Sequence, residues 1–256
     1  MSAPRLADRL RAGDTLLASW HAIPEPLVVE TVARAGFDVV VLDMQHGHFS
    51  RDSVLRSVGA AALAGKPAVV RIPVGGFGLA SWALDAGAEA VIAPMVNSTA
   101  DAAAFVEAMK YPPLGGRSWG PGRAMTLQGE ADGRAFLAAA NSSTLSIAMI
   151  ETSTALAALD EIVAMPGIDS VFVGPWDMSV SLSGGQTLDA GLPAVDEALA
   201  QVARAALSAG KVPATLAPGP ERARRAMDMG YRLIAVGGDT GYIADGVQRL
   251  LADCRA

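Results

Sequence analysis

Residue types that often carry structure or chemistry are scarce in this 256-residue chain. Cys254 is its one cysteine, so no disulfide can form within the chain, and we expect a reducing, cytoplasmic setting. Basic residues number 20 against 26 acidic ones, which gives a net charge of −6. Because nucleic acids and acidic membranes bind basic faces, we expect neither as a partner.

Long apolar runs are also missing. The chain has no unbroken stretch of the roughly 18 apolar residues that a membrane span needs. Charges are spread over residues 1–14, where a signal peptide would have an apolar core, so we expect no export signal. Yet 51% of the residues are hydrophobic, which suits one large core. We therefore expect a single domain over residues 1–256.

A repeating unit organises the sequence: a Gly that suits a helix C-cap, a short polar step, and then a run of Val, Ile, Leu and Ala. Such runs are typical of parallel strands that are buried on both faces. Six copies are ARAGFDVVVLD (33–43), LAGKPAVVRIP (63–73), LDAGAEAVIAP (84–94), AMPGIDSVFVGP (164–175), LSAGKVPATLAP (207–218) and MDMGYRLIAVGGD (227–239).

Two further apolar runs bring the number of predicted strands to eight. The predicted ranges are 16–20, 37–43, 68–73, 90–96, 146–151, 170–175, 213–217 and 232–238. Eight strands that alternate with helices predict a closed (β/α)8 TIM barrel. A doubly wound open sheet is the alternative, although such sheets usually have fewer strands and a Gly-rich nucleotide turn. The segment 112–135 breaks the repeat, and its Gly and Pro content predicts a long loop on the strand-4 side.

Two carboxylates follow neighbouring predicted strands. Glu151 ends the fifth strand and Asp177 follows the sixth. In a barrel, functional groups lie at the carboxyl ends of strands, and neighbouring strands stand about 5 Å apart. A hard divalent cation would relieve the repulsion between the two carboxylates. The alternative is that both residues are helix N-caps, with Asp177 capping a helix that begins near Met178.

Three other polar residues end the second and third strands. Arg71 lies among apolar neighbours, so it needs either a substrate oxyanion or a structural ion pair with Asp43 or Glu151. His46 follows the second strand and can act as a base, unless it is an ordinary solvent-exposed loop histidine. Asp43 either orients His46 or only ends its strand. His21 and His48 are interpreted as ordinary loop histidines.

The position of lysine excludes one kind of carbonyl chemistry. The three lysines are Lys66, Lys110 and Lys211, and none lies within a predicted strand, where a barrel aldolase would hold its Schiff-base lysine. Carbonyl chemistry in this chain would therefore need a metal ion as electron sink. No GxSxG elbow and no GxGxxG turn follows a predicted strand, so serine-hydrolase and dinucleotide-binding functions lose support.

Several segments together resemble the HpcH/HpaI aldolase family, whose members include 4-hydroxy-2-oxoheptanedioate and 2-dehydro-3-deoxyglucarate aldolases. The resemblance runs from about residue 5 to 250 in the same order, and the combination is specific. The segments are GFDVVVLDMQHG (36–47), AVVRIP (68–73), LDAGAEAVIAPMV (84–96), YPPLGGRS (111–118), IET (150–152) and VFVGPWDMSVSLSG (171–184). The resemblance implies a class II pyruvate aldolase, which reversibly cleaves 4-hydroxy-2-oxo acids to pyruvate, or a substituted pyruvate, and an aldehyde.

The resemblance also implies roles for individual residues. Glu151 and Asp177 match the ligands of a divalent ion (Mg²⁺, Mn²⁺ or Co²⁺). His46 matches the catalytic base, and Arg71 matches the arginine that stabilises the enolate. Asp43 matches an acidic residue near the histidine.

Further matches concern a second acidic residue that acts on the histidine and the residues that bind the substrate. Asp85 matches an acid that raises the basicity of the histidine across a subunit boundary, in keeping with a homo-oligomer, trimer or hexamer. The backbone amides of Trp176 and Asp177 match those that hold the pyruvate carboxylate. We also expect Gly174 and Leu216 to border the substrate.

Two departures from the family pattern concern substrate choice. Gln45 stands where the best-known members have Glu, and Met149 where they have a substrate-binding Gln. Two rival functions stay open: a citramalyl- or malyl-CoA-type lyase on a similar barrel, and a non-catalytic barrel that serves as a scaffold. The CoA lyase would need a groove with extra basic residues, which the acidic balance of the chain does not favour.

Overall fold

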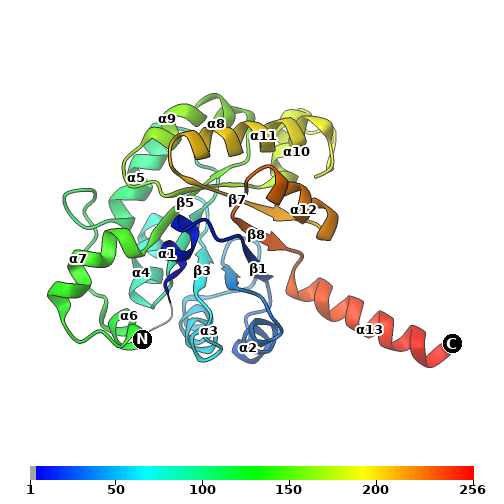
Figure 1. Ribbon diagram of the computed structural model, residues 1–256, viewed down its shortest axis with the longest axis horizontal. Coiled ribbons are helices and arrows are strands. Elements are labelled where there is room, and N and C mark those ends of the chain that lie inside the picture. The colour runs from blue at the N-terminus through cyan, green and yellow to red at the C-terminus, as the bar shows by residue number, and fades with distance from the viewer. Residues whose placement is uncertain (1–3) are drawn as a thin grey trace.

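The computed structural model of the protein describes residues 4–256, and this part of the chain forms a closed parallel barrel (Figure 1). Eight strands follow one another around the barrel in chain order, and the last one pairs with the first. They are β1 (Leu16–His21), β2 (Val39–Asp43), β3 (Ala68–Arg71), β4 (Ala90–Ala93), β5 (Leu145–Ile150), β6 (Ser170–Val173), β7 (Val212–Ala217) and β8 (Leu233–Val236). The predicted (β/α)8 barrel is confirmed, and the open-sheet alternative is wrong because β1 and β8 are paired.

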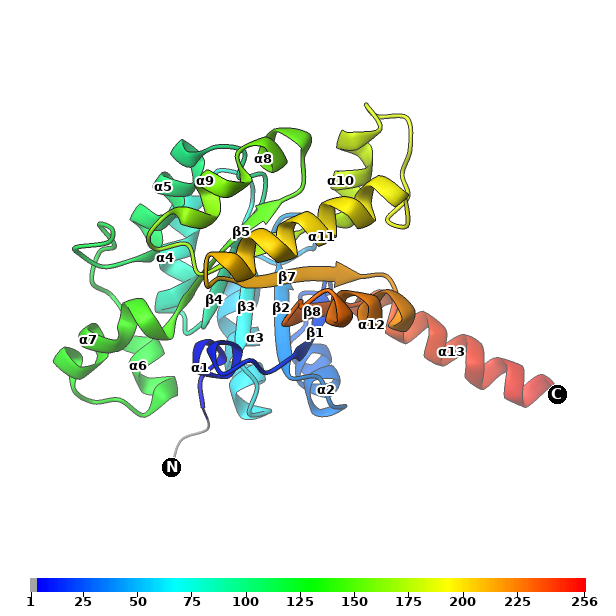
Figure 2. The same ribbon diagram turned by 45° about the horizontal axis from the view of Figure 1, so that its top comes forward.

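Helices connect the strands and surround the barrel (Figures 1 and 2). Those within residues 4–256 are α1 (Leu6–Arg11), α2 (Pro26–Arg34), α3 (Arg51–Leu63), α4 (Phe77–Asp85), α5 (Thr99–Met109), α6 (Gly122–Gln128), α7 (Gly133–Ser143), α8 (Ser153–Ala157), α9 (Leu159–Ala164), α10 (Pro175–Leu182), α11 (Pro193–Ser208), α12 (Pro220–Asp228) and α13 (Asp239–Arg255). None of these helices is both long and apolar enough to cross a membrane.

Successive side chains along each strand point alternately into the barrel and out toward the helices, which gives the protein two apolar cores. Side chains such as Val41, Ile147 and Phe172 fill the barrel interior. Their strand neighbours, such as Val40 and Ala148, pack instead against the surrounding helices. Because successive side chains point to opposite faces, a strand buried on both faces reads as a continuous apolar run. This double burial explains why the strands could be located from the sequence.

The predicted long loop 112–135 is partly helical, which corrects that expectation. It contains α6 and the beginning of α7. Its Gly and Pro residues bound helices: Pro121 is the N-cap of α6, and Gly129 ends it in a left-handed conformation with φ of 66°. Because the segment leads into the start of β5, it lies at the amino ends of the strands, opposite the carboxyl ends where barrel enzymes carry their active sites.

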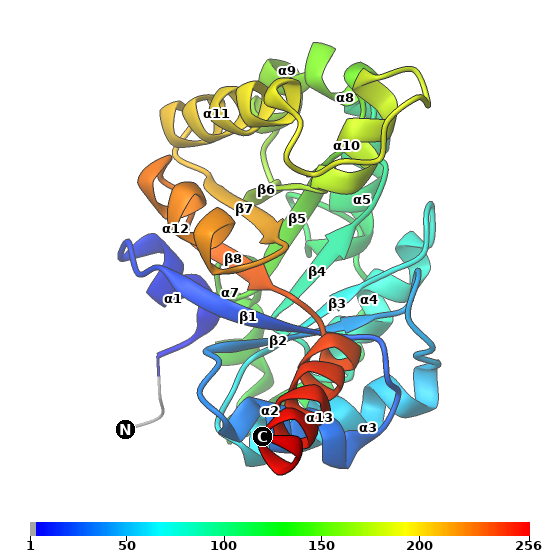
Figure 3. The ribbon, with the colours of Figure 1, turned by 90° about the vertical axis from the view of Figure 1, so that its right-hand side faces the viewer.

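The last helix leaves the barrel. α13 extends away from the other helices in Figures 1 and 2, and it points toward the viewer in Figure 3. Among its residues only Asp239 is buried. Its large apolar side chains are 42–64% exposed, and they recur at helical spacing. They are Ile243, Val247, Leu250 and Leu251.

The base of α13 is anchored on β1. The Asp239 carboxylate accepts hydrogen bonds from the backbone amides of Ala22 and Ile23. Its Oδ2 also lies 3.5 Å from Nδ1 of His21, whose Nε2 lies 2.9 Å from the Ser19 hydroxyl. His21 is therefore fully buried at the end of a strand, and its interpretation as a solvent-exposed loop histidine was wrong. The signal was the alternation in β1, which turns His21 outward beneath the helices.

Candidate active site

A cavity of about 200 Å³ opens at the carboxyl ends of the strands. Seven of the predicted site residues line it: His46, Arg71, Met149, Gly174, Trp176, Asp177 and Leu216. The other lining residues are Trp20, Phe172 and Pro175. The fold thus brings together side chains that are up to 196 positions apart in the sequence, from Trp20 to Leu216.

Asp43 organises one side of this cavity. It is the strand partner of Arg71 across β2 and β3, so the two side chains start from the same level of the barrel. Arg71 donates from Nε to Asp43 Oδ1 (2.9 Å) and from Nη2 to Oδ2 (2.6 Å), which forms a two-pronged ion pair. Burial pushes the pKa of the Asp43 carboxyl upward, but the hydrogen bonds and charge of Arg71 outweigh it and hold this pKa below its usual value. The ion-pair interpretation of Arg71 is therefore confirmed.

The same carboxylate also fixes the chain around His46. Asp43 Oδ1 accepts from the backbone amides of Gln45 (2.9 Å) and His46 (3.3 Å). Asp43 thus positions the loop that carries His46 through its backbone rather than by a bond to the imidazole. His46 itself is exposed at the cavity, as a group that meets a substrate must be.

Trp20 completes this side of the cavity, and sequence reasoning missed it. Its indole Nε1 donates to Asp43 Oδ2 at 3.2 Å. The Arg71 guanidinium lies over the face of the Trp20 ring, with its central carbon 4.7 Å from the ring centre, which is a cation–π contact. Trp20 points into the barrel, as do Leu16 and Ala18 on the same strand. This alternation in β1, with a large aromatic near the carboxyl end, was the available signal.

Glu151 and Asp177 lie on the opposite side. Glu151 is 2% exposed, and the backbone amide of Met95 donates to its Oε1 at 2.7 Å. Met95 has a φ of 54°, an uncommon backbone conformation for a residue other than glycine, so the β4–α5 loop is shaped to present this amide. The role of Met95 could not be predicted, because backbone conformation leaves no mark on the residue type.

Neither carboxylate is a helix N-cap. Thr152 caps α8, so Glu151 precedes the cap. α10 begins at Pro175 with Gly174 as its N-cap, which places Asp177 within the first turn, where its charge suits the helix dipole. The capping alternatives for both residues are therefore wrong. The helix starts earlier than expected because Pro favours the first helical position.

Gly174 leaves room for the carboxylate. A Cβ at this position would lie 2.5 Å from Glu151 Oε2 and 3.0 Å from the terminal methyl of Met149. Any larger residue would displace one of these side chains. Gly174 therefore places Glu151 at the edge of the cavity, directly beside Met149.

These oxygen donors fit a divalent ion of the hard class. Burial raises the pKa of Glu151 to about 7; the Met95 amide lowers this pKa and the negative charge of Asp177 raises it further. A cation between the two carboxylates would relieve both burial and repulsion. No group of three or more His, Cys, Asp or Glu residues with ligand geometry occurs within residues 4–256. Two carboxylates with the remaining positions left to substrate and water are typical of Mg²⁺ sites.

The raised pKa of Glu151 has a measurable consequence for the metal-free protein. Between the usual glutamate pKa near 4.3 and about 7, the folded protein holds a proton that the unfolded chain has lost, so stability falls as pH rises. The loss amounts to about 3 kcal/mol of unfolding free energy, as an order of magnitude. Urea unfolding at pH 5 and pH 8 measures it. Glu151→Gln is expected to flatten the profile and Glu221→Gln, on the surface, to leave it unchanged; identical profiles for wild type and Glu151→Gln would contradict the assignment.

The lysines lie far from this cavity. Lys110 is fully buried and donates to the Thr144 carbonyl and to Asp169, and Lys211 donates to the Ile168 carbonyl. Both are held before the amino ends of strands, and Lys66 likewise precedes β3. Within residues 4–256 no lysine lines the cavity, as the sequence predicted.

Comparison with known proteins identifies the family of this chain. The family model described as HpcH/HpaI aldolase/citrate lyase matches residues 17–245. The chain belongs to this family. It is a carbon–carbon lyase of the aldolase type.

Three relatives show how far the similarity of this aldolase extends. Hydroxypyruvate/pyruvate aldolase of Rhizorhabdus wittichii is 35% identical over 244 residues, 95% of this chain and 96% of that protein. The 2-keto-3-deoxy-L-rhamnonate aldolase of Klebsiella pneumoniae is 33% identical, with 95% and 90% covered. The crystal structure of a family protein from Burkholderia cenocepacia superposes with a TM-score of 0.87 at 30% identity, covering 98% of this chain and 99% of that one.

Three predicted residues of the aldolase do not line the cavity: Asp43 lies behind Arg71 and Glu151 behind Gly174, whereas Asp85 is far from it. Asp85 ends α4, which leads into the amino end of β4, whereas His46 follows the carboxyl end of β2. The two residues therefore lie at opposite ends of the same barrel. Within its own chain Asp85 accepts a hydrogen bond from Arg117 at 2.6 Å, and Arg117 stacks over Tyr111. A role for Asp85 beside His46 would require the His46 of another subunit.

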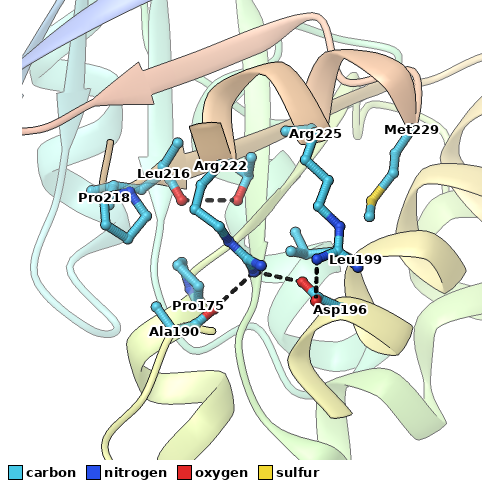
Figure 4. Close-up of a pocket in the computed structure, with 12 residues that line it drawn as sticks. Pro175, Ala190, Asp196, Leu199, Leu216, Pro218, Arg222, Arg225 and Met229 are labelled. Atoms are coloured by element: carbon cyan, nitrogen blue, oxygen red, sulfur yellow. Dashed lines mark hydrogen bonds and ion pairs between the residues drawn. The ribbon is translucent and has the colours of Figure 1, made fainter. Parts of the chain in front are cut away.

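A separate pocket of the aldolase lies behind β7, between α11 and α12 (Figure 4). Two arginines point into it, and both contact one carboxylate. Arg222 donates to Asp196 Oδ1 (2.5 Å) and to the Ala190 carbonyl, and Arg225 lies 2.8 Å from Asp196 Oδ2. These contacts join α12 to α11.

Proposed function

We propose that this protein is a metal-dependent class II aldolase that reversibly cleaves 4-hydroxy-2-oxo acids to an aldehyde and pyruvate or hydroxypyruvate. One observation carries the proposal: Asp177, His46 and Arg71 line a single cavity, Glu151 lies directly behind Gly174 in its wall, and no lysine is among its lining residues within 4–256. The names of the relatives support pyruvate and hydroxypyruvate as donors.

One set of residues would bind the metal ion and the donor. Glu151 and Asp177 would hold a divalent ion (Mg²⁺, Mn²⁺ or Co²⁺), which supplies a Lewis acid that withdraws electron density from the keto group. The amides of Trp176 and Asp177, at the start of α10, would bind the donor's carboxylate, because a helix N-terminus presents free N–H groups. Gly174 keeps the space beside them open for Glu151.

Proton transfer and charge stabilisation fall to the other side. His46 would take a proton from the carbon next to the keto group, as an exposed imidazole can near neutral pH. Arg71, held by Asp43 through Nε and Nη2, would turn its remaining edge toward the oxygen that gains negative charge. The resulting enolate attacks the aldehyde carbonyl, a carbon–carbon bond forms, and the alkoxide takes up a proton.

The experiment is a direct assay with pyruvate or hydroxypyruvate, an aldehyde and a divalent ion. Aldol products, together with exchange of the pyruvate methyl hydrogens in D₂O, would support the proposal. A malyl-CoA-type lyase would instead act on CoA thioesters. Its substrate carries phosphates, and Arg71 is the one Lys or Arg among the cavity's lining residues within 4–256, so the aldolase is favoured. Turnover of the thioester alone would reverse this choice.

We further propose that the enzyme is a homo-oligomer, trimer or hexamer, assembled through α13 and located in the cytoplasm, where its exposed Cys254 would stay reduced. A helix that leaves its own barrel with an apolar stripe needs a partner to bury that stripe. A second copy would also allow its Asp85 to reach His46.

The oligomer has its own test. Val247→Glu combined with Leu250→Glu is expected to yield a smaller species in light scattering and to lower activity at least tenfold. Arg249→Glu, on the opposite side of α13, is the matched control. Unchanged mass in the double variant would mean that α13 does not hold the oligomer together.

A further inference from the structure

The lining of the cavity consists of a few ionisable groups and a larger set of apolar side chains. Its ionisable groups are His46, Arg71 and Asp177, with Glu151 behind them. Every other side chain in the lining is apolar or aromatic except for the glycine. Two of these form the rim: Trp176, which is 42% exposed in the first turn of α10, and Leu216, which lies on β7 beside it.

The donor must occupy the part of the cavity that the ionisable groups border. Its carboxylate and keto oxygens need amide donors, a cation and a guanidinium, which the start of α10, the Glu151–Asp177 pair and Arg71 would supply from two sides of the donor. An incoming aldehyde therefore meets the donor from the rim, where its far end lies against Trp176 and Leu216. Phe172, whose ring is tilted against that of Trp20 with the ring centres 5.8 Å apart, forms the apolar floor below them.

Within residues 4–256 the chain itself supplies only one cation to the lining of this cavity. That cation is Arg71, which is bound to Asp43 and turned toward the donor. Arg222 and Arg225 do not line the cavity; they lie behind β7 in the adjoining pocket of Figure 4, which shares Leu216 and Pro175 with it, and both are held by the one carboxylate of Asp196. A carboxylate or phosphate on the aldehyde would therefore lie unpaired against apolar side chains.

We propose that the rim formed by Trp176 and Leu216 selects neutral, apolar aldehydes as acceptors and rejects anionic ones. The proposal rests on the proposed aldolase function and names the acceptor class of that site. An apolar tail gains by leaving water, whereas an unpaired charge loses its hydration without replacement. Both effects favour the neutral aldehyde.

Butanal and 4-oxobutanoate make a matched pair, since both have four carbons and only the latter carries a terminal carboxylate. With pyruvate as donor, kcat/KM for butanal is expected to exceed that for 4-oxobutanoate about tenfold or more. Leu216→Lys places a cation on the rim and is expected to shift this ratio at least about tenfold toward 4-oxobutanoate. Trp176→Lys is a second variant in case the first does not fold.

Two controls accompany these variants. Leu216→Met keeps the rim neutral and should keep the preference for butanal. Leu63→Lys adds the same charge at an exposed position (74%) where α3 ends at the opposite end of the barrel, and it should leave the ratio unchanged. If Leu63→Lys shifted the ratio as much as Leu216→Lys, the rim would not be responsible.

Exchange of the pyruvate methyl hydrogens in D₂O, measured without aldehyde, tests the aldolase proposal independently of the acceptor proposal. Exchange together with equal or better use of 4-oxobutanoate by the wild type would overturn the acceptor proposal and leave the aldolase proposal standing. Such a result would also point to a cation supplied by a second copy. Absence of both exchange and aldol products would overturn the aldolase proposal, and the acceptor proposal with it.

Discussion

Removal of divalent ions is expected to abolish aldol activity, whereas borohydride added with pyruvate leaves the activity intact. Chelation removes the ion that Glu151 and Asp177 would hold, since the third carboxylate beside the cavity, Asp43, is paired with Arg71. Borohydride acts by reducing an imine, and an imine needs a lysine amine at the substrate. Lys110 and Lys211 are instead tied to carbonyls and a carboxylate at the other end of the barrel.

The measurement has two arms on the same preparation. In the first, chelated enzyme is assayed and then given Mg²⁺, Mn²⁺ or Co²⁺ separately; recovery is expected, and the ranking identifies the preferred ion. In the second, enzyme is treated with borohydride in the presence of pyruvate, and its mass is checked for a trapped adduct. Loss of activity with borohydride alone, together with an adduct, would establish an imine mechanism and refute the metal proposal.

The barrel could be predicted because each of its strands is marked by the same short sequence pattern, which recurs along the chain. Each strand is buried on both faces, so its sequence is an uninterrupted apolar run, and the residue that ends the preceding helix is usually Gly. The site followed from the same pattern: the charged residues Asp43, Arg71 and Glu151 end apolar runs at the carboxyl ends of the strands, where barrel enzymes carry their chemistry.

What could not be predicted depends on contacts between distant parts of the chain. The amide of Met95 reaches Glu151 because of a backbone conformation. The partner of the buried His21 is Asp239, 218 residues away, and no local pattern links the two. The segment 112–135 was misread because Gly and Pro also begin and end helices, as Pro121 and Gly129 do here. Composition alone does not separate these two uses.

His46→Ala is expected to lower turnover by about 10²–10⁴-fold, the usual loss when a general base is removed. The metal content should stay unchanged, because the oxygen ligands belong to Glu151 and Asp177 on the opposite side of the cavity. Asp43 bonds to the backbone of His46 and to Arg71, so the alanine variant keeps the loop and the guanidinium in place. The loss should therefore fall on the rate of hydrogen exchange from pyruvate more than on the affinity for it.

Three measurements on purified variants decide the role of His46: bound metal by mass spectrometry, exchange of the pyruvate methyl hydrogens in D₂O, and the aldol rate. His48→Ala is the matched control, since His48 is exposed two residues further along the same segment and does not line the cavity. Loss of metal in His46→Ala would make the imidazole a ligand. Equal activity in both variants would place the base elsewhere. Loss of exchange with metal retained, in His46→Ala alone, is the result that a general base at this position requires.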